Sequence, residues 1–175
     1  RFDRAFFGHV GFVASTAARA LLLGLTNGRL DRDAPGSAQT RRACQRLGRA
    51  SAAFALVSDA AMATLGGELK RREKLTGRLA DALAWLYLGS SVVKRFADAG
   101  EPESERAFAL WATEHALAEI DRALDGALRN LPARPVAWVL RALVFPLGLR
   151  AHGPDDALGS AVARALLGDE RARDA

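Results

Sequence analysis

Cysteine and histidine are scarce in this chain of 175 residues, which has one cysteine, Cys44. A disulfide within the chain and a metal site built from cysteines are therefore excluded, and a reducing, cytoplasmic compartment is expected. The three histidines, His9, His115 and His152, are too far apart in sequence to form a helical metal-binding pair. Aromatic residues make up only 7% of the chain, which favours closely packed helices over a sandwich or a barrel.

Lysine and long apolar runs are also scarce. The formal net charge is +5, but lysine occurs only at Lys70, Lys74 and Lys94, so the other basic side chains are arginine. The arginines are spread along the chain and mixed with acidic residues, which is typical of solvated helix faces, and we expect no nucleic-acid partner. The most apolar stretch, residues 135–149, is too short to span a bilayer and contains Arg141.

Apolar residues recur at helical spacing along the chain, and no segment shows the alternation of a strand. The expected helices cover residues 3–26, 40–65, 68 or 73–97, 104–130, 136–144 and 155–167. This pattern predicts an all-α fold, a helical bundle of about five to six helices with short loops. We expect one domain over residues 1–175, and a longer parent chain because the first residue is not methionine. The later half of the third helix is apolar nearly all round, which predicts a central position in the bundle.

Few side chains are candidates for chemistry. Cys44 falls on a predicted buried seam, which indicates a core residue rather than a nucleophile, and His115 is expected to be packed and hydrogen-bonded. Asp59 lies among apolar residues, where a buried carboxylate needs a partner. Arg78 on the next helix, or Arg71 or Arg72 before it, is a candidate partner in an ion-pair network that fixes helix register. The alternative role for Asp59, a catalytic base, would require a substrate pocket.

A glycine pair followed by cations raises the question of an anion site. Gly66 and Gly67 precede Lys70, Arg71 and Arg72, and free N–H groups at a helix start attract anions. The spacing matches neither nucleotide-binding fingerprint. The alternatives are an anion or core-contact site and a bend between two packed helices, with the cations holding carboxylates.

The stretch 135–149 has the composition of a surface-binding helix. Its apolar residues include Trp138, Val144 and Phe145, and Arg141 interrupts them. A short cationic helix that carries tryptophan can lie in a lipid headgroup layer. These four residues are therefore a candidate membrane face or a candidate docking face against another part of the protein.

Four motifs, in order, resemble one protein family. They are "FDRAFFGHVGFVAS", "LGGELKRREKLTGRLADALAWLYLGSSVVKRF", "LRNLPARP" and "FPLGLRAHGPDDALG". Together they resemble the C-terminal region of the bacterial long-chain acyl-CoA dehydrogenases of fatty-acid β-oxidation, over nearly the whole chain. "RLADALAWLYLGSSVVKR" is also similar, more loosely, to the extra C-terminal helical domain of the mitochondrial very-long-chain enzymes.

The resemblance implies the C-terminal domain of an oxidoreductase that acts on CH–CH bonds. Members bind FAD, a catalytic glutamate removes the α-proton of the acyl thioester, a hydride passes to the flavin, and an electron-transfer flavoprotein accepts the electrons. Those functions belong to the preceding dehydrogenase core, so this fragment carries no catalytic residue and is not expected to bind FAD alone. Glu68 and Glu73 fall within the matched motif, but neither is assigned as the base.

By the same resemblance, this domain is expected to pack on the core, shape the channel for long-chain acyl-CoA and help place the enzyme at the inner membrane. The alternative is a free-standing basic helical module that binds an anionic membrane or a protein partner. An open reading frame with a dehydrogenase core before Arg1 would separate the two interpretations.

Overall fold

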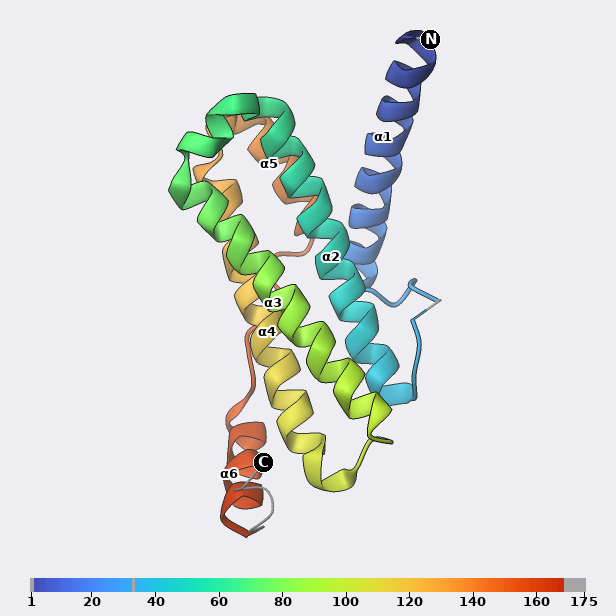
Figure 1. Ribbon diagram of the computed structural model, residues 1–175, viewed down its shortest axis with the longest axis vertical. Helices are drawn as coiled ribbons and strands as arrows, with labels where there is room; N and C mark the ends of the chain where they lie inside the picture. Colours follow the sequence, from blue (N-terminus) through green and yellow to red (C-terminus); the bar gives the residue numbers. More distant parts are fainter. Residues whose placement is uncertain (1, 33, 169–175) are drawn as a thin grey trace.

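The computed structural model describes the backbone of residues 2–32 and 34–168, and their side chains except at 2–10, 12, 13 and 39. The elements are α1 (Phe2–Thr26), α2 (Ala38–Leu65), the 3-10 helix η1 (Gly66–Arg71), α3 (Glu73–Asp98), α4 (Glu103–Asn130), α5 (Arg134–Val144) and α6 (Asp156–Gly168). The described ranges contain no strand. The predicted all-α helical bundle is therefore confirmed (Figure 1).

Helices end where the backbone leaves the right-handed helical region. α1 is followed by Asn27 and Gly28, which have positive φ angles of 49° and 81°. Gly28 lies so close to the carbonyl of Gln45 on α2 that a Cβ atom would overlap it, so only glycine fits this turn. α2 ends at Leu65, because the next residue, Gly66, has a positive φ of 52°. The tighter η1 then occupies most of the residues before α3 begins at Glu73.

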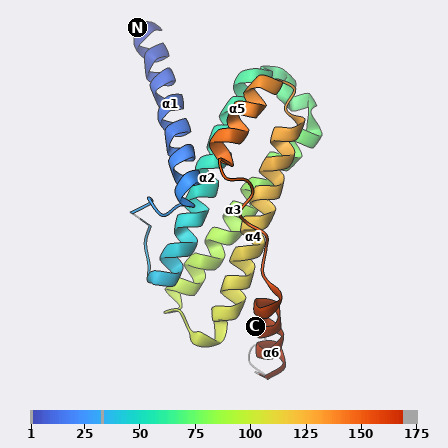
Figure 2. The same cartoon turned by 180° about the vertical axis from the view of Figure 1, so that it is seen from behind.

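The core lies between α2, α3 and α4, and α5 covers it at one end. α4 contributes the side chains of Leu117, Ile120 and Leu124, which have no exposed surface. Burial of one such aliphatic side chain contributes about 1.5–3 kcal/mol to folding. α4 is central because it contacts α2, α3, α5 and α6 (Figure 2).

The prediction that the third helix occupies the centre of the bundle is wrong. α3 buries one stripe, which includes Leu79, Leu86 and Val93. Its second apolar side remains uncovered: Leu83 is 54% exposed and Tyr87 is 73% exposed. The reason is that α2 and α4 cover one side of α3, and no described element lies over the other.

Three helices approach closely at Gly89. A Cβ atom at this position of α3 would lie 3.1 Å from a methyl group of Leu47 on α2 and 3.2 Å from Cβ of Ala116 on α4. Such distances are tighter than ordinary van der Waals contact, so a side chain here would push the helices apart. Gly89 therefore fixes the distance between α3 and its two neighbours.

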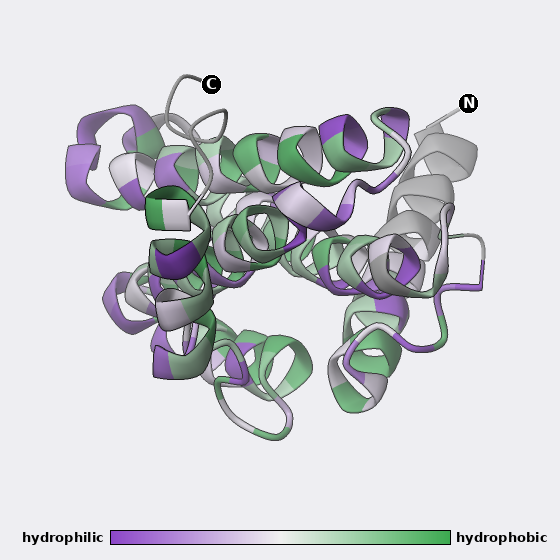
Figure 3. Ribbon diagram, turned by 90° about the horizontal axis from the view of Figure 1, so that it is seen from below, coloured by the Kyte–Doolittle hydropathy of each residue, from purple (hydrophilic) through white to green (hydrophobic). Residues whose placement is uncertain are grey.

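The first and last helices lie at the periphery. α1 contacts α2 and α5, and its N-terminal part extends away from the bundle (Figures 1 and 2). α6 packs on α4 and buries none of its described residues. Figure 3 shows the hydropathy of the coloured residues with the bundle seen from below. The peripheral helices thus depend on few neighbours, whereas α4 is surrounded.

Candidate functional site

A groove of 820 Å³ lies between α2 and α3. Its walls are one face of each helix, and the loop before α2 contributes Pro35 and Gly36 at one end. The lining is mostly apolar, with a few hydroxyl groups: it includes Thr40, Leu47, Ser51 and Phe54 from α2, and Leu83, Leu86, Tyr87, Ser90 and Val93 from α3. A pocket of this size and composition is typical of small-molecule sites.

The groove has a buried floor and an exposed rim. Leu47, Leu86 and Val93 form the floor and are each at least nine-tenths buried. Leu83 and Tyr87 on α3 form part of the rim and are more than half exposed. The floor therefore also belongs to the bundle core, while the rim is free to contact something else.

Hydrogen bonds tie α2 to the loop before α4 near the Thr40 end of the groove. The hydroxyls of Ser37 and Thr40 donate to the two carboxylate oxygens of Glu101, at 2.5 and 2.8 Å. These bonds hold the pKa of Glu101 below its usual range, because they favour the charged form. On α3, the ammonium of Lys94 lies 2.6 Å from a carboxylate oxygen of Asp98. The charges at this end are thus paired within the chain.

Cys44 lines the same groove and is half-buried. Burial raises the pKa of its thiol above the usual value, and the charge of Asp31 acts in the same direction. The thiol is therefore held in its protonated, weakly nucleophilic form, which agrees with the expectation of a packing role.

The predicted anion or core-contact site lies on the exposed connection between α2 and α3, and contact with a ligand or the core there stays a prediction. Gly66 and Gly67 belong to a six-residue 3-10 helix and are exposed, together with Lys70 and Arg71. Arg72 faces Glu68 at 3.6 Å across a solvent-exposed pair. The stretch is the connection between α2 and α3, and a bend with cations near a carboxylate describes it.

Asp59 and Arg78 do not form the predicted ion pair, since none of the ion pairs in the described ranges joins them. Asp59 is half-buried on α2. Arg78 donates to the carbonyl of Lys74 at 3.0 Å and lies against Gly126 on α4. Arg78 therefore packs toward α4 rather than toward α2, so its charged group does not contact that of Asp59.

The buried ion pair joins other residues. Arg49 on α2 donates to the carboxylate of Asp121 on α4 at 2.7 Å, and the two side chains are 4% and 2% exposed. The second carboxylate oxygen of Asp121 accepts the backbone N–H of Ala151 at 3.3 Å. The sequence signal that could have found this pair is the position of Asp121 between the buried Ile120 and Leu124. Asp121 thus links α2, α4 and the segment before α6.

A second charge cluster lies beside α5. Asp125 on α4 accepts from Arg141 on α5 and from Arg129, the latter at 2.7 Å. The predicted membrane or docking face is therefore corrected in part. Arg141 faces Asp125, and Val144 and Phe145 are buried in the core with 1% and 6% exposure.

Another set of apolar residues reaches solvent on and after α5. Trp138 is 65% exposed, and Val139, Leu147 and Leu149 are also exposed. α5 turns its opposite side to the core through Ala137, Leu140 and Val144. Of the four predicted face residues, Trp138 alone presents an apolar surface to solvent.

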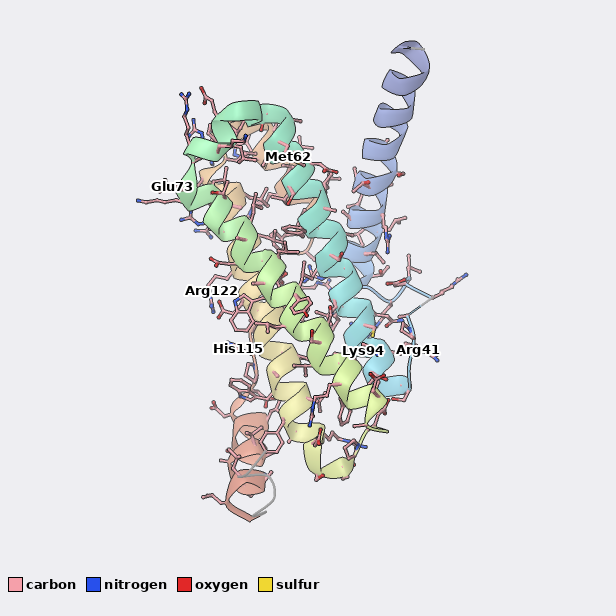
Figure 4. All side chains as sticks on the ribbon, in the orientation of Figure 1. Arg41, Met62, Glu73, Lys94, His115 and Arg122 are labelled. Atoms are coloured by element: carbon pink, nitrogen blue, oxygen red, sulfur yellow. The ribbon has the colours of Figure 1, made fainter. Side chains whose placement is uncertain are left out.

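The described residues hold no cluster of histidine, cysteine and carboxylate side chains that could bind a metal. His115 on α4 packs between two indole rings, edge-on to Trp85 and stacked on Trp111, with both ring centroids 5.1 Å away (Figure 4). His152 is exposed, and the side chain of His9 lies outside the described set. The expected packing of His115 is therefore confirmed, but the hydrogen bonds of the described residues include none to its ring.

By length and hydropathy, one run within the described ranges, Thr40–Arg71, could cross a membrane. It comprises most of α2 together with η1. Core helices of soluble bundles meet the same criteria, and α2 contributes Leu47, Ala50 and Leu56 to the core and Arg49 to the buried ion pair. We interpret α2 as a bundle helix on these contacts.

The family model described as acyl-CoA dehydrogenase, C-terminal, bacterial type, matches residues 1–175. The chain belongs to this family. No solved structure matches the chain. Membership in the acyl-CoA dehydrogenase C-terminal family implies association with a dehydrogenase core and suggests an oxidoreductase as the parent enzyme.

Acyl-CoA dehydrogenases generally use FAD, but the described residues do not fit that cofactor. A dinucleotide needs cations or N–H groups for its pyrophosphate and a flat pocket for its ring system. The groove between α2 and α3 is apolar and its charged residues, Lys94 and Asp98, are paired with each other. The cations after Gly67 lie in solvent on η1. We therefore assign no step of flavin chemistry to the residues of this domain.

Proposed function

We propose that this chain is the C-terminal helical domain of an FAD-dependent acyl-CoA dehydrogenase that oxidises long-chain acyl-CoA in β-oxidation. The observation that carries the proposal is the family match over residues 1–175. The parent enzyme supplies the flavin and the catalytic base, and passes electrons to an electron-transfer flavoprotein. The domain packs on the dehydrogenase core and shapes the acyl channel.

The apolar rim of the groove supports the packing role. Leu83 and Tyr87 are adjacent on α3, exposed, and continuous with the apolar groove. Contiguous exposed apolar residues mark a surface that another protein region or a ligand covers. In an accessory domain, the core of the same enzyme is the partner that is always present.

The surface of α5 and the segment after it supports a second role, contact with a membrane. The α5 surface consists of Trp138, Val139, Leu147 and Leu149. Between Asp125 and Asp155 the sequence holds four arginines and no acidic residue. Two of these arginines pair with Asp125, which leaves Arg134 and Arg150 without an acidic partner among the described residues. Exposed apolar residues beside uncompensated arginine favour an anionic headgroup layer, so the enzyme is proposed to be cytoplasmic and peripheral at the inner membrane.

The first experiment compares the intact parent enzyme with a version that ends just before Arg1. FAD content, oxidation of octanoyl-CoA and stearoyl-CoA, and flotation with phosphatidylglycerol vesicles are measured for both. The proposal expects truncation to leave flavin bound, to weaken oxidation of the longer substrate and to abolish flotation. An intact parent that holds no flavin and oxidises no acyl-CoA would contradict the dehydrogenase assignment.

The α5 surface is tested by the double substitution W138S/V139S in the intact enzyme. Because each buried apolar side chain contributes about 1.5 kcal/mol or more, vesicle binding should weaken by at least about tenfold. Leu88→Ser on α3 is the matched control, since Leu88 is also exposed but lies outside both surfaces. Equal binding by the double variant and the control would exclude the α5 surface as the membrane contact.

A further inference from the structure

The charged groups that line the groove between α2 and α3 are exposed and paired with each other. Its charged lining residues are Lys94 and Asp98, which form an ion pair at 2.6 Å. Thr40 donates its hydroxyl to Glu101. Because burying an unpaired charge or polar group against this lining would be costly, the complementary occupant is uncharged and apolar.

The residues that line the groove extend along much of the length of α2 and α3. On α2 the lining runs from Thr40 to Phe54, a helical distance of about 20 Å at a rise of about 1.5 Å per residue. Pro35 and Gly36 lie at the Thr40 end, and the buried Leu47, together with residues of α3, forms the floor. An extended apolar chain fits a groove of this length better than a compact ring system.

We propose that this groove binds the methyl-terminal part of a long acyl chain. The floor residues of this domain would contact the methylene groups, and the dehydrogenase core would cover the open side along Leu83 and Tyr87. The assignment rests on the proposed function, since the family match supplies the acyl substrate. It goes beyond that function by assigning the distal part of the channel to the residues between α2 and α3.

The test fills the groove without removing any floor residue. Ser90 is exposed and lines the groove, and Ser91 is its exposed neighbour outside the lining. Ser90→Phe and the matched control Ser91→Phe are made in the intact parent enzyme. The kcat/KM for flavin reduction is then measured with octanoyl-CoA and stearoyl-CoA.

Ser90→Phe should lower kcat/KM for stearoyl-CoA by about tenfold or more. The reason is that excluding even one methylene group of the substrate from an apolar pocket lowers kcat/KM by about that factor. The same variant should keep its kcat/KM for octanoyl-CoA within about twofold, and Ser91→Phe should do so for both substrates. An unchanged rate for Ser90→Phe with stearoyl-CoA would overturn the proposal. An equal loss with both substrates would also overturn it, since that result indicates a helix of the core seated in the groove.

A direct measurement complements the kinetics. A stearoyl-CoA analogue with a diazirine at its methyl end is photolysed on the intact enzyme, and the labelled peptides are identified. The proposal expects label in the α2 and α3 segments that line the groove, and competition by stearoyl-CoA. Label confined to the core would exclude the groove. If the label is confined to the core but the enzyme still oxidises octanoyl-CoA, the groove assignment is wrong and the dehydrogenase assignment stands.

Discussion

α3 and α4 are neighbours of nearly equal length, yet they have opposite relations to solvent. α4 is buried along most of its length and carries the fully enclosed Leu117 and Ile120. α3 is buried along one stripe and exposes Leu83 and Tyr87 on another side. The comparison shows that apolar composition alone does not identify the structural centre of this bundle. α4 holds the fold together, and α3 presents the surface that we assign to function.

The largest expected effect is the loss of the buried ion pair. Asp121→Ala leaves Arg49 buried without its partner and removes the acceptor of the Ala151 N–H group. We expect a loss of about 3–5 kcal/mol in the free energy of unfolding, measured by urea denaturation. The double variant R49M/D121L is the control, because an apolar pair of similar volume should recover much of this loss. A single variant as stable as the wild type would contradict the assigned role of Asp121.

The second effect compares the same substitution on the two helices. Leu117→Ala on α4 creates a cavity at a fully buried site, and should cost about 2–5 kcal/mol. Leu83→Ala on α3 removes a half-exposed side chain and should change the free energy of unfolding by no more than about 0.5 kcal/mol. Equal losses for the two variants would mean that the groove rim contributes to the core.

A third substitution addresses the contact where α2, α3 and α4 meet. Gly89→Val places a side chain against Leu47 and Ala116, and overpacking of this kind costs about 1–3 kcal/mol. Gly77→Val on the same helix meets nothing within 4 Å and serves as the control. If the two valine variants have the same thermal midpoint, the close approach at Gly89 is not a constraint on packing.

The smallest expected effect is a pH dependence of the free energy of unfolding that arises from Glu101, near the Thr40 end of the groove. The pKa of Glu101 is lowered by hydrogen bonds from Ser37 and Thr40. Its contribution to stability is therefore present above the usual pKa of glutamate, and is lost as the pH falls through the lowered value. Glu101→Gln should reduce the difference in unfolding free energy between neutral and acidic pH. If the free energy of unfolding of Glu101→Gln falls at acidic pH as much as that of the wild type, these hydrogen bonds do not contribute to stability.

Much of the fold could be predicted from the sequence, because helical spacing identifies amphipathic segments locally. The predicted helix ends near Gly28 and Gly66 agree with the structure for the same reason, because the positive φ angles there are favoured by the local sequence. Which of two apolar stripes is covered depends on the neighbouring helices. This is why the exposure of Leu83 and Tyr87, and the burial of Val144 and Phe145, could not be read from periodicity.

The charged residues of the candidate sites were the hardest to place. Asp59 and Asp121 both stand among apolar residues in sequence, but only Asp121 meets an arginine within the described part of the chain. Periodicity does not say which arginine of another helix lies opposite a carboxylate. The partner of Asp121 is Arg49, which is 72 positions away along the chain, so the pair depends on how α2 and α4 are aligned.

The peripheral position of α6 has a consequence for how the domain unfolds. α6 buries none of its described residues, and the preceding segment is tied to α4 by the bond from Ala151 to Asp121. Its backbone amides should therefore exchange with solvent through a local opening that leaves α4 folded. The amides of α4 should exchange only when the whole bundle opens. A hydrogen-exchange experiment should therefore show slow exchange in α4 and faster exchange in α6, which opens independently of α4.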